Sequence, residues 1–546
     1  MIDNGAARGF WAGLCGAVLI ALTACGDGTQ TNSASSPGTA NEIVLNRGNG
    51  AEPKSLDPAL IDGIWEAQIS GDMILGLTTE DAESKPIAGA AESWETSEDG
   101  LTWTFHLRDH TWSDGVPVTA EDFVFAWRRI LDAKMAAPYA YYLYPIKNAR
   151  DVNAGKQPAT ALGVEAKDAK TLVVTLDHPL PFMTEYLTHQ STYPVPRHVV
   201  EAKGTEWTRP GNFVSNGPYV FEAWTPNDRV TLKKNPRFYD AANVKIDVVN
   251  YFPTPDGDAA LRRLRAGELD TQDPISPLQI DFLRSNMADA LKIAPTLTTS
   301  YLSINLTRKP LDDIRIREAL NLAIERETLV ERIIKLGDPP AYNMVPPGTA
   351  NYPGGVEMRF KSMPFEQRLA RAQELMREAG YTTERPLKIG WATTTNAVTR
   401  QTIAPLQEMW RKIYVDVEII QSDTQINYQK LEDGDFEIGT AGWVADYNDA
   451  SNFLDVLRTG AGNNYGRYSN PKFDALLDQA ASERVLAKRG QILAQAEQMM
   501  LDDYPLVLVR FPTQPAVVQP YVKGWIPSSK QINRTRWLTV QKGLGG

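Results

Sequence analysis

Cysteine is almost absent from this sequence. Its 546 residues include two, Cys15 and Cys25, and Cys15 lies inside an apolar segment near the N-terminus. If that segment is removed on export, one cysteine remains and no disulfide can form within the chain. A fold stabilised by disulfide bonds is therefore excluded. Stability has to come from a hydrophobic core, which a chain of this length can bury.

The chain also lacks an excess of basic residues. Lys and Arg number 56 against 67 Asp and Glu, so the net charge is −11, and no basic run stands out. A surface that binds nucleic acid or an anionic membrane needs the opposite balance. We therefore expect no nucleic-acid partner.

Motifs for catalysis and for metal binding are missing as well. Gly155 and Lys156 are not followed by Ser or Thr, so there is no phosphate-binding loop. There is no G-x-S-x-G nucleophile elbow and no spaced cysteines for zinc. His106 and His110 are four apart, but "HLRDH" is predicted as a strand and turn, where they do not share a face. No catalytic residue, metal or cofactor is predicted, although a glycosidase pair of carboxylates is set by distance in space and cannot be read from sequence.

The one long apolar run lies at the N-terminus. "WAGLCGAVLIALTAC" (11–25) has signal-peptide length and is too short for a permanent membrane span. Its end, "LTAC" (22–25), resembles the bacterial lipobox, in which the cysteine is lipidated and becomes the first mature residue. We expect a lipoprotein signal peptide over 1–24, lipidation at Cys25 and a flexible polar tether over 25–41. The alternative is an ordinary secretory signal with a chance cysteine.

The rest of the chain alternates strand-like and helix-like segments without a repeat. Short runs of β-branched and aromatic residues predict strands at 42–46, 103–108, 171–176, 415–420, 435–438 and 504–511. Apolar spacing predicts helices at 119–132, 312–337 (broken near Arg326), 365–380, 402–413 and 482–503. Thr119 and Asp122 form a near-capping box, and Gly380 is placed to end its helix. The pattern indicates a mixed α/β chain of several domains or two large lobes.

One stretch raises a chemical question. In "GTAGWVADYND" (439–449) Asp446 stands between Trp443 and Tyr447, and both aromatic residues favour at least partial burial. A lone carboxylate is costly to remove from water. Either this stretch is an exposed turn, or Asp446 meets a cation that arrives from outside.

Three long segments carry a resemblance to a known family. They are "NRGNGAEPKSLDPAL" (46–60), "AESWETSEDGLTWTFHLRDHTWSDGVPVTAEDFVFAWRRILD" (91–132) and "SNGPYVFEAWTPNDRVTLKKNPRFYD" (215–240). These segments closely resemble the family 5 extracellular solute-binding proteins, the peptide receptors of ABC importers. A narrower resemblance, to the oligopeptide-binding or Opp-type branch, is carried by "MAAPYAYYL" (135–143), "PPAYNMVPPG" (339–348) and "GWVADYNDASNFLD" (442–455).

The resemblance implies an α/β, two-lobe periplasmic-binding-protein-like fold with an extra subdomain. The first lobe is expected to span 42–297, with one subdomain from 42–74 plus 199–297 and a second from 75–198. The second lobe is expected to span 298–510, and 511–546 to return to the first lobe. Two chain crossings then make a hinge, and a ligand is enclosed when the lobes close.

The resemblance also implies a ligand site. Asp446 stands where Opp-type receptors hold the peptide's α-ammonium, which answers the question above, since a buried carboxylate needs a paired cation. Trp443 and Tyr139 match pocket residues of the family, and Asp62 matches an acidic position beside the ligand backbone. Main-chain groups of 61–65 and of the segment after Gly439 are expected to pair with an extended peptide, as in strand addition. The other implied contacts are Ile64, Arg308, Thr440, Tyr447 and Asn448.

Plainer interpretations of these residues remain open. Asp446 can be a solvated turn acid, Trp443 and Tyr139 can be core residues, and Asp62 can be a loop acid. The carboxylate end of the site also departs from the family, because Thr399 and Thr440 stand where Opp-type proteins place Arg or His. A Trp common in the family is replaced at about Thr424. Arg308 and Lys309 are left as candidates to meet the far end of the ligand.

The function implied is that of a receptor and not of an enzyme. It is expected to be a monomeric, lipid-anchored protein of the cell envelope or periplasm that delivers short peptides to an ABC permease. Other interpretations are a receptor of the same fold for a metal chelate, haem or sugar, an enzyme, and a signalling or chaperone role added to binding. Asp446 favours a ligand with an amine, and the scarcity of histidine disfavours a metal.

Overall fold

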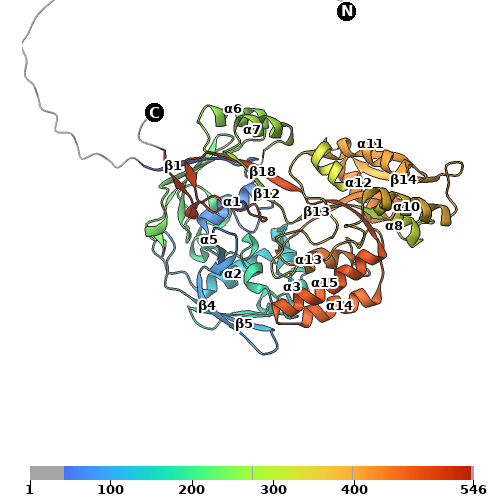
Figure 1. Cartoon of the computed structure of the whole chain (residues 1–546). Coiled ribbons are helices and arrows are strands. Elements are labelled where there is room, and N and C mark those ends of the chain that lie inside the picture. Colours follow the sequence, from blue (N-terminus) through green and yellow to red (C-terminus); the bar gives the residue numbers. More distant parts are fainter. Residues whose placement is uncertain (1–41, 274, 396, 543–546) are drawn as a thin grey trace, which may run out of the picture. The chain divides into compact units, whose positions relative to one another are not determined.

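The computed structural model describes residues 42–273, 275–395 and 397–542 (Figure 1). The predicted signal peptide, tether and lipidated Cys25 lie outside these residues. Three sheets of four or more strands organise the described part of the chain. No helix within it has the length and apolar content that a membrane span requires.

A seven-stranded sheet contains the first strand and the last long strand. Its order is β12 (Leu291–Pro295), β18 (Thr513–Val518), β11 (Thr271–Gln272), β1 (Val44–Gly48), β10 (Val248–Phe252), β9 (Arg229–Lys234), β8 (Tyr219–Thr225). β1 runs parallel to β10 and β11, and the other pairs are antiparallel. Helices α1 (Ile64–Met73), α6 (Gly257–Arg265) and α7 (Ile280–Asn286) belong to the same region.

A four-stranded antiparallel sheet is built from one continuous part of the chain. Its order is β4 (Ala91–Thr96), β5 (Thr102–Leu107), β7 (Thr171–Thr175), β6 (Val164–Ala166). Helix α2 (Ala120–Ile130) begins after Thr119, whose backbone N–H donates to the Asp122 carboxylate at 2.8 Å. Its apolar side, including Phe123, Trp127 and Ile130, is buried in the core. The predicted near-capping box therefore fixes where this helix starts.

A five-stranded sheet takes all its strands from 298–510. Its order is β15 (Val415–Ser422), β14 (Leu387–Thr394), β16 (Ile438–Val444), β13 (Thr298–Ile304), β17 (Leu506–Arg510). The longer helices of this stretch are α8 (Ile314–Leu322), α10 (Phe365–Glu378), α11 (Ala397–Arg411), α12 (Thr424–Asp433), α14 (Pro471–Ser482) and α15 (Leu486–Asp503).

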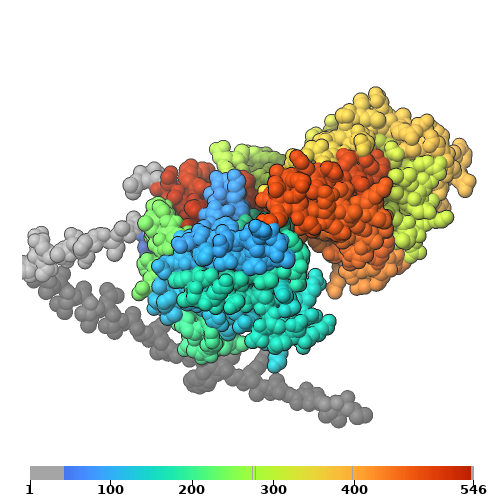
Figure 2. Space-filling view, turned by 90° about the horizontal axis from the view of Figure 1, so that it is seen from below, coloured from blue at the N-terminus to red at the C-terminus, as the bar shows by residue number. Residues whose placement is uncertain are grey.

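Two large hydrophobic cores follow the same division of the chain. One is formed by buried residues from 45–251 with Val518, Val522 and Leu538. The other is formed by residues from 297–511. In Figures 1 and 2 the orange α14 and α15 lie beside the blue and cyan part of the chain. There Phe182 stacks on Tyr447 with ring centroids 5.0 Å apart, and the Arg489 guanidinium lies 4.9 Å from the Phe182 ring.

The chain passes between the two large sheets twice. It leaves β12 at Pro295 and enters β13 at Thr298, and it leaves β17 at Arg510 and enters β18 at Thr513. The crossings touch, because the backbone N–H and the hydroxyl of Thr296 both donate to the Pro512 carbonyl, at 3.2 and 2.6 Å. The buried Asp338 carboxylate braces the return crossing by accepting bonds from Arg510 and Thr513.

Most predicted elements are present, and one is misplaced. The strands at 103–108 and 171–176 are β5 and β7, and Gly380, at φ +90°, follows the end of α10. The predicted helix at 312–337 is divided into α8, the short α9 (Arg326–Thr328) and a π-helical turn, Leu329–Ile334. The strand predicted at 435–438 is wrong, because β16 starts only at Ile438 and runs to Val444. Its glycines and alanine give a weak strand signal, and pairing with β13 along its whole length decides the outcome.

Candidate functional site

Two cavities, each of about 500 Å³, meet at Asp446, Tyr142 and Tyr447. We call the one that also contains Trp443, Asp177 and Arg150 the Arg150 cavity, and the one that contains Asp62, Tyr139 and Lys530 the Lys530 cavity. Both take residues from the regions of both hydrophobic cores. Each is within the size range of a complete small-molecule site.

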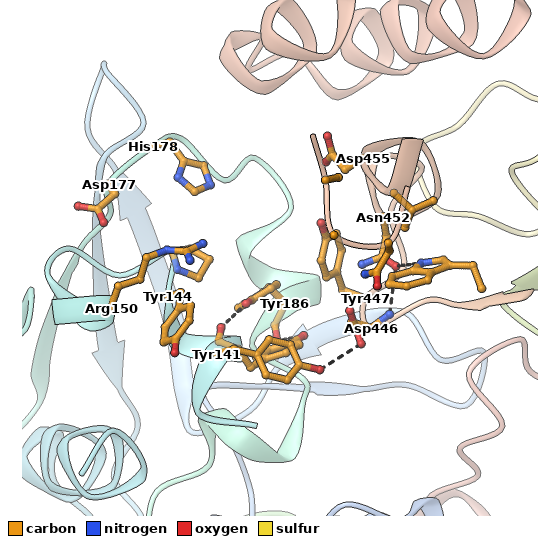
Figure 3. A pocket seen from close by; sticks show the side chains of 17 residues that line it. Tyr141, Tyr144, Arg150, Asp177, His178, Tyr186, Asp446, Tyr447, Asn452 and Asp455 are labelled. Carbon is orange, nitrogen blue, oxygen red and sulfur yellow. Dashed lines mark hydrogen bonds between the residues drawn. The ribbon is translucent and has the colours of Figure 1, made fainter. Parts of the chain in front are cut away.

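Asp446 lies just beyond the end of β16 and has no cationic partner among the described residues. Its carboxylate accepts a weak bond from the Tyr141 hydroxyl at 3.4 Å (Figure 3). Burial raises the pKa of Asp446 above its usual range, while hydrogen bonds from Tyr141 and Asn452 act in the opposite direction. Three residues on, Asp449 is 1% exposed but is paired with Arg489 at 2.6 Å. The fold thus supplies a cation to Asp449 and leaves Asp446 without one.

Asn452 fixes the turn that carries Asp446. Its side-chain oxygen accepts from the Trp443 indole N–H at 2.7 Å and from the Asp446 backbone N–H at 3.2 Å. Asn452 comes from the short helix α13 (Ser451–Leu454) and is 5% exposed. One buried amide therefore holds both the aromatic and the acidic residue, and no local pattern in the sequence predicts this role.

The aromatic residues of the site pack in one continuous row, in which Tyr142 stacks on Tyr186 with ring centroids 4.1 Å apart. Tyr447 lies between Phe182 and Tyr186, at centroid distances of 5.0 and 5.6 Å, so its ring joins the first core as well as lining the cavities. Tyr139 packs on His189 at 4.9 Å, and the His189 ring stacks on Tyr142 at 4.1 Å. Desolvation lowers the pKa of His189 to about 3, so its ring is neutral.

The loop before α1 brings Asp62 to the Lys530 cavity, and the first residue of that helix, Ile64, also lines it. The fully buried Glu66 carboxylate organises this loop by accepting backbone N–H bonds from Lys54, Asp62 and Gly63. Asp62 is exposed and forms a surface pair with Lys54 at 3.1 Å. Helix α1 starts at Ile64, so an extended main chain is available only up to Gly63.

Close to Asp446 one side of β16 has no strand partner among the described residues, although Tyr428 forms a hydrogen bond with the Gly442 backbone. All seven of its residues pair with β13, whereas β14 reaches only Ile438 and Gly439. From Ala441 to Val444 the other side of β16 therefore has no strand partner among the described residues. This edge ends two residues before Asp446.

The structure does not bring all predicted residues to the cavities. Asn448 lines the Lys530 cavity while its side chain accepts from the Ala350 backbone N–H at 2.8 Å. Thr440 lines neither cavity, because its hydroxyl bonds Trp391 and Thr393, both at 2.9 Å. Arg308 also lies apart from the cavity walls, is exposed, and donates to the Gly434 carbonyl at 3.1 Å.

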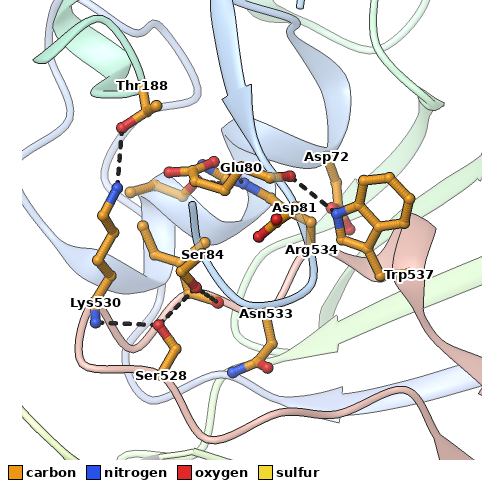
Figure 4. Close-up of polar contacts among 12 residues, drawn as sticks. Asp72, Glu80, Asp81, Ser84, Thr188, Ser528, Lys530, Asn533, Arg534 and Trp537 are labelled. Carbon is orange, nitrogen blue, oxygen red and sulfur yellow. Dashed lines mark hydrogen bonds and ion pairs between the residues drawn. The ribbon is translucent and has the colours of Figure 1, made fainter. Parts of the chain in front are cut away.

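The C-terminal segment supplies a wall that the sequence did not predict (Figure 4). Lys530 forms an ion pair with Glu185 and lies 3.4 Å from the Thr188 hydroxyl. Behind it, Arg534 pairs with Glu80 at 3.2 Å. Burial raises the pKa of Glu185, and Lys530 opposes that shift. Within the described residues no cluster of His, Cys, Asp and Glu is placed to hold a metal ion.

Comparison with known proteins agrees with this geometry. A family model described as "Bacterial extracellular solute-binding proteins, family 5 Middle" matches residues 85–465. The periplasmic oligopeptide-binding protein OppA of Salmonella typhimurium is 36% identical over 516 residues, which are 93% of this chain and 94% of OppA. The chain belongs to family 5 of the bacterial extracellular solute-binding proteins.

Solved structures of family 5 proteins share this fold. The unliganded open form of MppA, a periplasmic murein tripeptide-binding protein, gives a TM-score of 0.86 at 31% identity and covers 92% of this chain and 98% of that one. Haemophilus influenzae OppA in complex with RPPGFSPFR gives a TM-score of 0.71 at 33% identity and covers 92% of this chain and 100% of that one. The predicted α/β, two-lobe fold of this class is confirmed.

Proposed function

We propose that this family 5 protein is a lipid-anchored extracytoplasmic receptor that binds short peptides by their α-amino group and backbone. The observation that carries the proposal is Asp446, a half-buried carboxylate that has no cationic partner among the described residues and lies at the junction of two cavities. An ammonium from the ligand supplies the missing charge. Trp443, Tyr139 and Tyr447 enclose it.

Backbone recognition is supported by the side of β16 that lacks a strand partner. A peptide whose ammonium lies at Asp446 runs past Ala441–Val444, where main-chain groups lack a strand partner. Strand addition there provides affinity that does not depend on ligand side chains. Asp62, Ile64 and Asn448 line the Lys530 cavity.

The two lobes close on the ligand about the crossings at 296–297 and 511–512. The first lobe comprises 42–297. One of its subdomains is formed by 42–74 plus 199–297, and the other by 75–198. The second lobe comprises 298–510, and 511–546 returns to the first lobe. The distribution of strands among the three sheets and the two separate cores support this division. Closure removes water from Asp446 and strengthens its ion pair.

The lipobox-like sequence supports the anchor, and the relatives support the peptide ligand and the transporter partner. Cys25 is the acylated residue, and several acyl chains attach the protein stably to a membrane of the cell envelope. The protein acts as a monomer and passes its ligand to the permease subunits of an ABC importer. OppA, the oligopeptide-binding relative, supports peptides as the ligand class.

A mass spectrum of the purified protein, recorded first under native conditions and then after denaturation, tests this function. We expect a mass excess in the native spectrum that is released on denaturation as a set of short peptides with free amino groups. Release of a metal chelate, haem or sugar instead would contradict the proposal and favour another ligand class in the same fold.

A further inference from the structure

The two cavities differ in the cations that they offer to a ligand. Their walls carry six carboxylates and two cationic side chains: Asp62, Glu80, Asp177, Glu185, Asp446 and Asp455, against Arg150 and Lys530. Lys530 is 10% exposed and already paired with Glu185. Arg150 forms no ion pair with any residue that the structure describes. It is the cation that these walls leave free for a ligand.

Arg150 is held in place by an aromatic support. It lies on the short helix α3 (Ala149–Asn153), and its guanidinium is 4.7 Å from the centre of the Tyr144 ring. The Tyr144 hydroxyl donates to Asn153 at 2.8 Å, and the Asn153 amide donates to the Leu131 carbonyl at 3.0 Å. A cation stacked on a fixed ring loses less freedom on binding than one on a mobile chain.

Arg150 and Asp446 face the same cavity from different parts of the fold. Figure 3 shows the Arg150 guanidinium pointing into the cavity from the side of Tyr144, with Asp446 across the cavity beside Tyr141. A negative and a positive group at two ends of one cavity are complementary to a dipolar ligand. A guanidinium binds a carboxylate through two parallel N–H donors.

We propose that Arg150 binds a carboxylate that the ligand carries close to its α-ammonium. The inference rests on the proposed function, because it places that ammonium at Asp446. Two sources have this chemistry: the acidic side chain of a first residue, and the C-terminal carboxylate of a very short peptide. Arg150 thus selects peptides with an acidic first residue or dipeptides, while Asp446 binds only the amino group.

Asp177, an acidic residue of the same cavity, provides a control whose expected effect is opposite to that of Arg150. It is exposed, lines the same cavity, and has no ion pair with a described residue. Its charge therefore repels a ligand carboxylate bound at Arg150. Asp455, in contrast, is paired with Arg458 at 3.2 Å. Removing the charge of Asp177 should leave a neutral ligand unaffected and bind an acidic one more tightly.

Calorimetry with two pairs of peptides tests the inference. The first pair is glutamate followed by three alanines, against the same peptide with glutamine first. The second is dialanine against dialanine amide. Because Arg150 is exposed before the lobes close, we expect the wild-type protein to prefer the carboxylate-bearing member of at least one pair by about five- to tenfold.

In Arg150→Gln that preference should fall to about twofold or less, which is under 0.5 kcal/mol. In Asp177→Asn the preference for the carboxylate-bearing peptide should grow. Lys147 is an exposed cation nearby that does not line the cavity, so Lys147→Gln should leave this preference unchanged. If Arg150→Gln loses the preference within the first pair, Arg150 binds the side-chain carboxylate of the first residue. If it loses the preference within the second pair, Arg150 binds the C-terminal carboxylate. An equal preference in wild type and Arg150→Gln would overturn the inference and leave the proposed function intact. Failure of the wild-type protein to bind any of the four peptides would overturn both.

Discussion

Replacing Asn452 with alanine tests whether the site is built around Asp446. The change removes one oxygen that accepts from the Trp443 indole at 2.7 Å and from the Asp446 backbone N–H at 3.2 Å. A lost hydrogen bond costs about 1 kcal/mol, and a donor left buried costs about 1–3 kcal/mol. Trp443 and Asp446 are both half-buried, so water replaces part of what is lost. We expect a loss of unfolding free energy of about 1–3 kcal/mol for the two bonds together.

The same substitution should also weaken ligand binding. Without Asn452 the turn is free to rotate, and the Asp446 carboxylate loses its fixed direction toward the ligand. We expect trialanine to bind on the order of tenfold more weakly to Asn452→Ala, about 1.4 kcal/mol. Chemical denaturation measures the stability and calorimetry the affinity.

Two variants make the Asn452 test specific. Asn452→Asp keeps an acceptor oxygen and should lose less affinity than the alanine variant. Asn463→Ala changes an exposed residue of the same cavity wall and should leave both measurements near the wild-type values. Unchanged trialanine binding in a folded Asn452→Ala protein would refute the reasoning.

Three further predictions concern stability, anchoring and motion. Glu497 is fully buried and accepts from Met344, Val345 and Tyr352, and desolvation raises its pKa from 4.5 to about 7. Its protonated form favours folding, so the stability difference between wild type and Glu497→Gln should fall as pH rises from 4.5 to 7; a flat difference would contradict this. The depressed pKa values of His110 and His189 act in the opposite direction but cancel in that difference. Cys25→Ala should abolish membrane attachment of processed protein in cell fractionation, and processed mutant in the membrane fraction would rule out lipidation. Bound peptide should reduce the radius of gyration measured by solution scattering, and an unchanged radius with binding confirmed would count against lobe closure.

Local signals in the sequence predicted the elements whose ends are determined locally. Thr119 and Asp122 start α2, and Gly380 follows the end of α10, because capping and positive φ depend on a few neighbouring residues. The position of β16 could not be found in this way. Its strand is made by pairing with β13, which lies more than a hundred residues earlier in the chain.

The candidate site shows the same limit. Asp446 was detectable because an acid between two aromatic residues is unusual within one short stretch, and the family resemblance gave it a role. Arg150 and Lys530 were not detectable, because each stands in an ordinary polar segment. Only the fold places Arg150 across a cavity from Asp446 and Lys530 beside Glu185. The same fold directs Thr440 to Trp391 and Thr393 and away from both cavities.

The central claim is that Asp446 pairs with the ligand's α-ammonium. When the lobes close on a ligand without that charge, an unpaired buried carboxylate costs roughly 3–5 kcal/mol, a loss on the order of 10² to 10³ in affinity. The most direct test is calorimetry of trialanine and N-acetyl-trialanine on wild-type protein and on Asp446→Asn. We predict that either change alone weakens binding severely and that both together cost clearly less than the sum, because they remove one interaction. Full additivity, or tight binding of the acetylated peptide to the wild-type protein, would contradict the account.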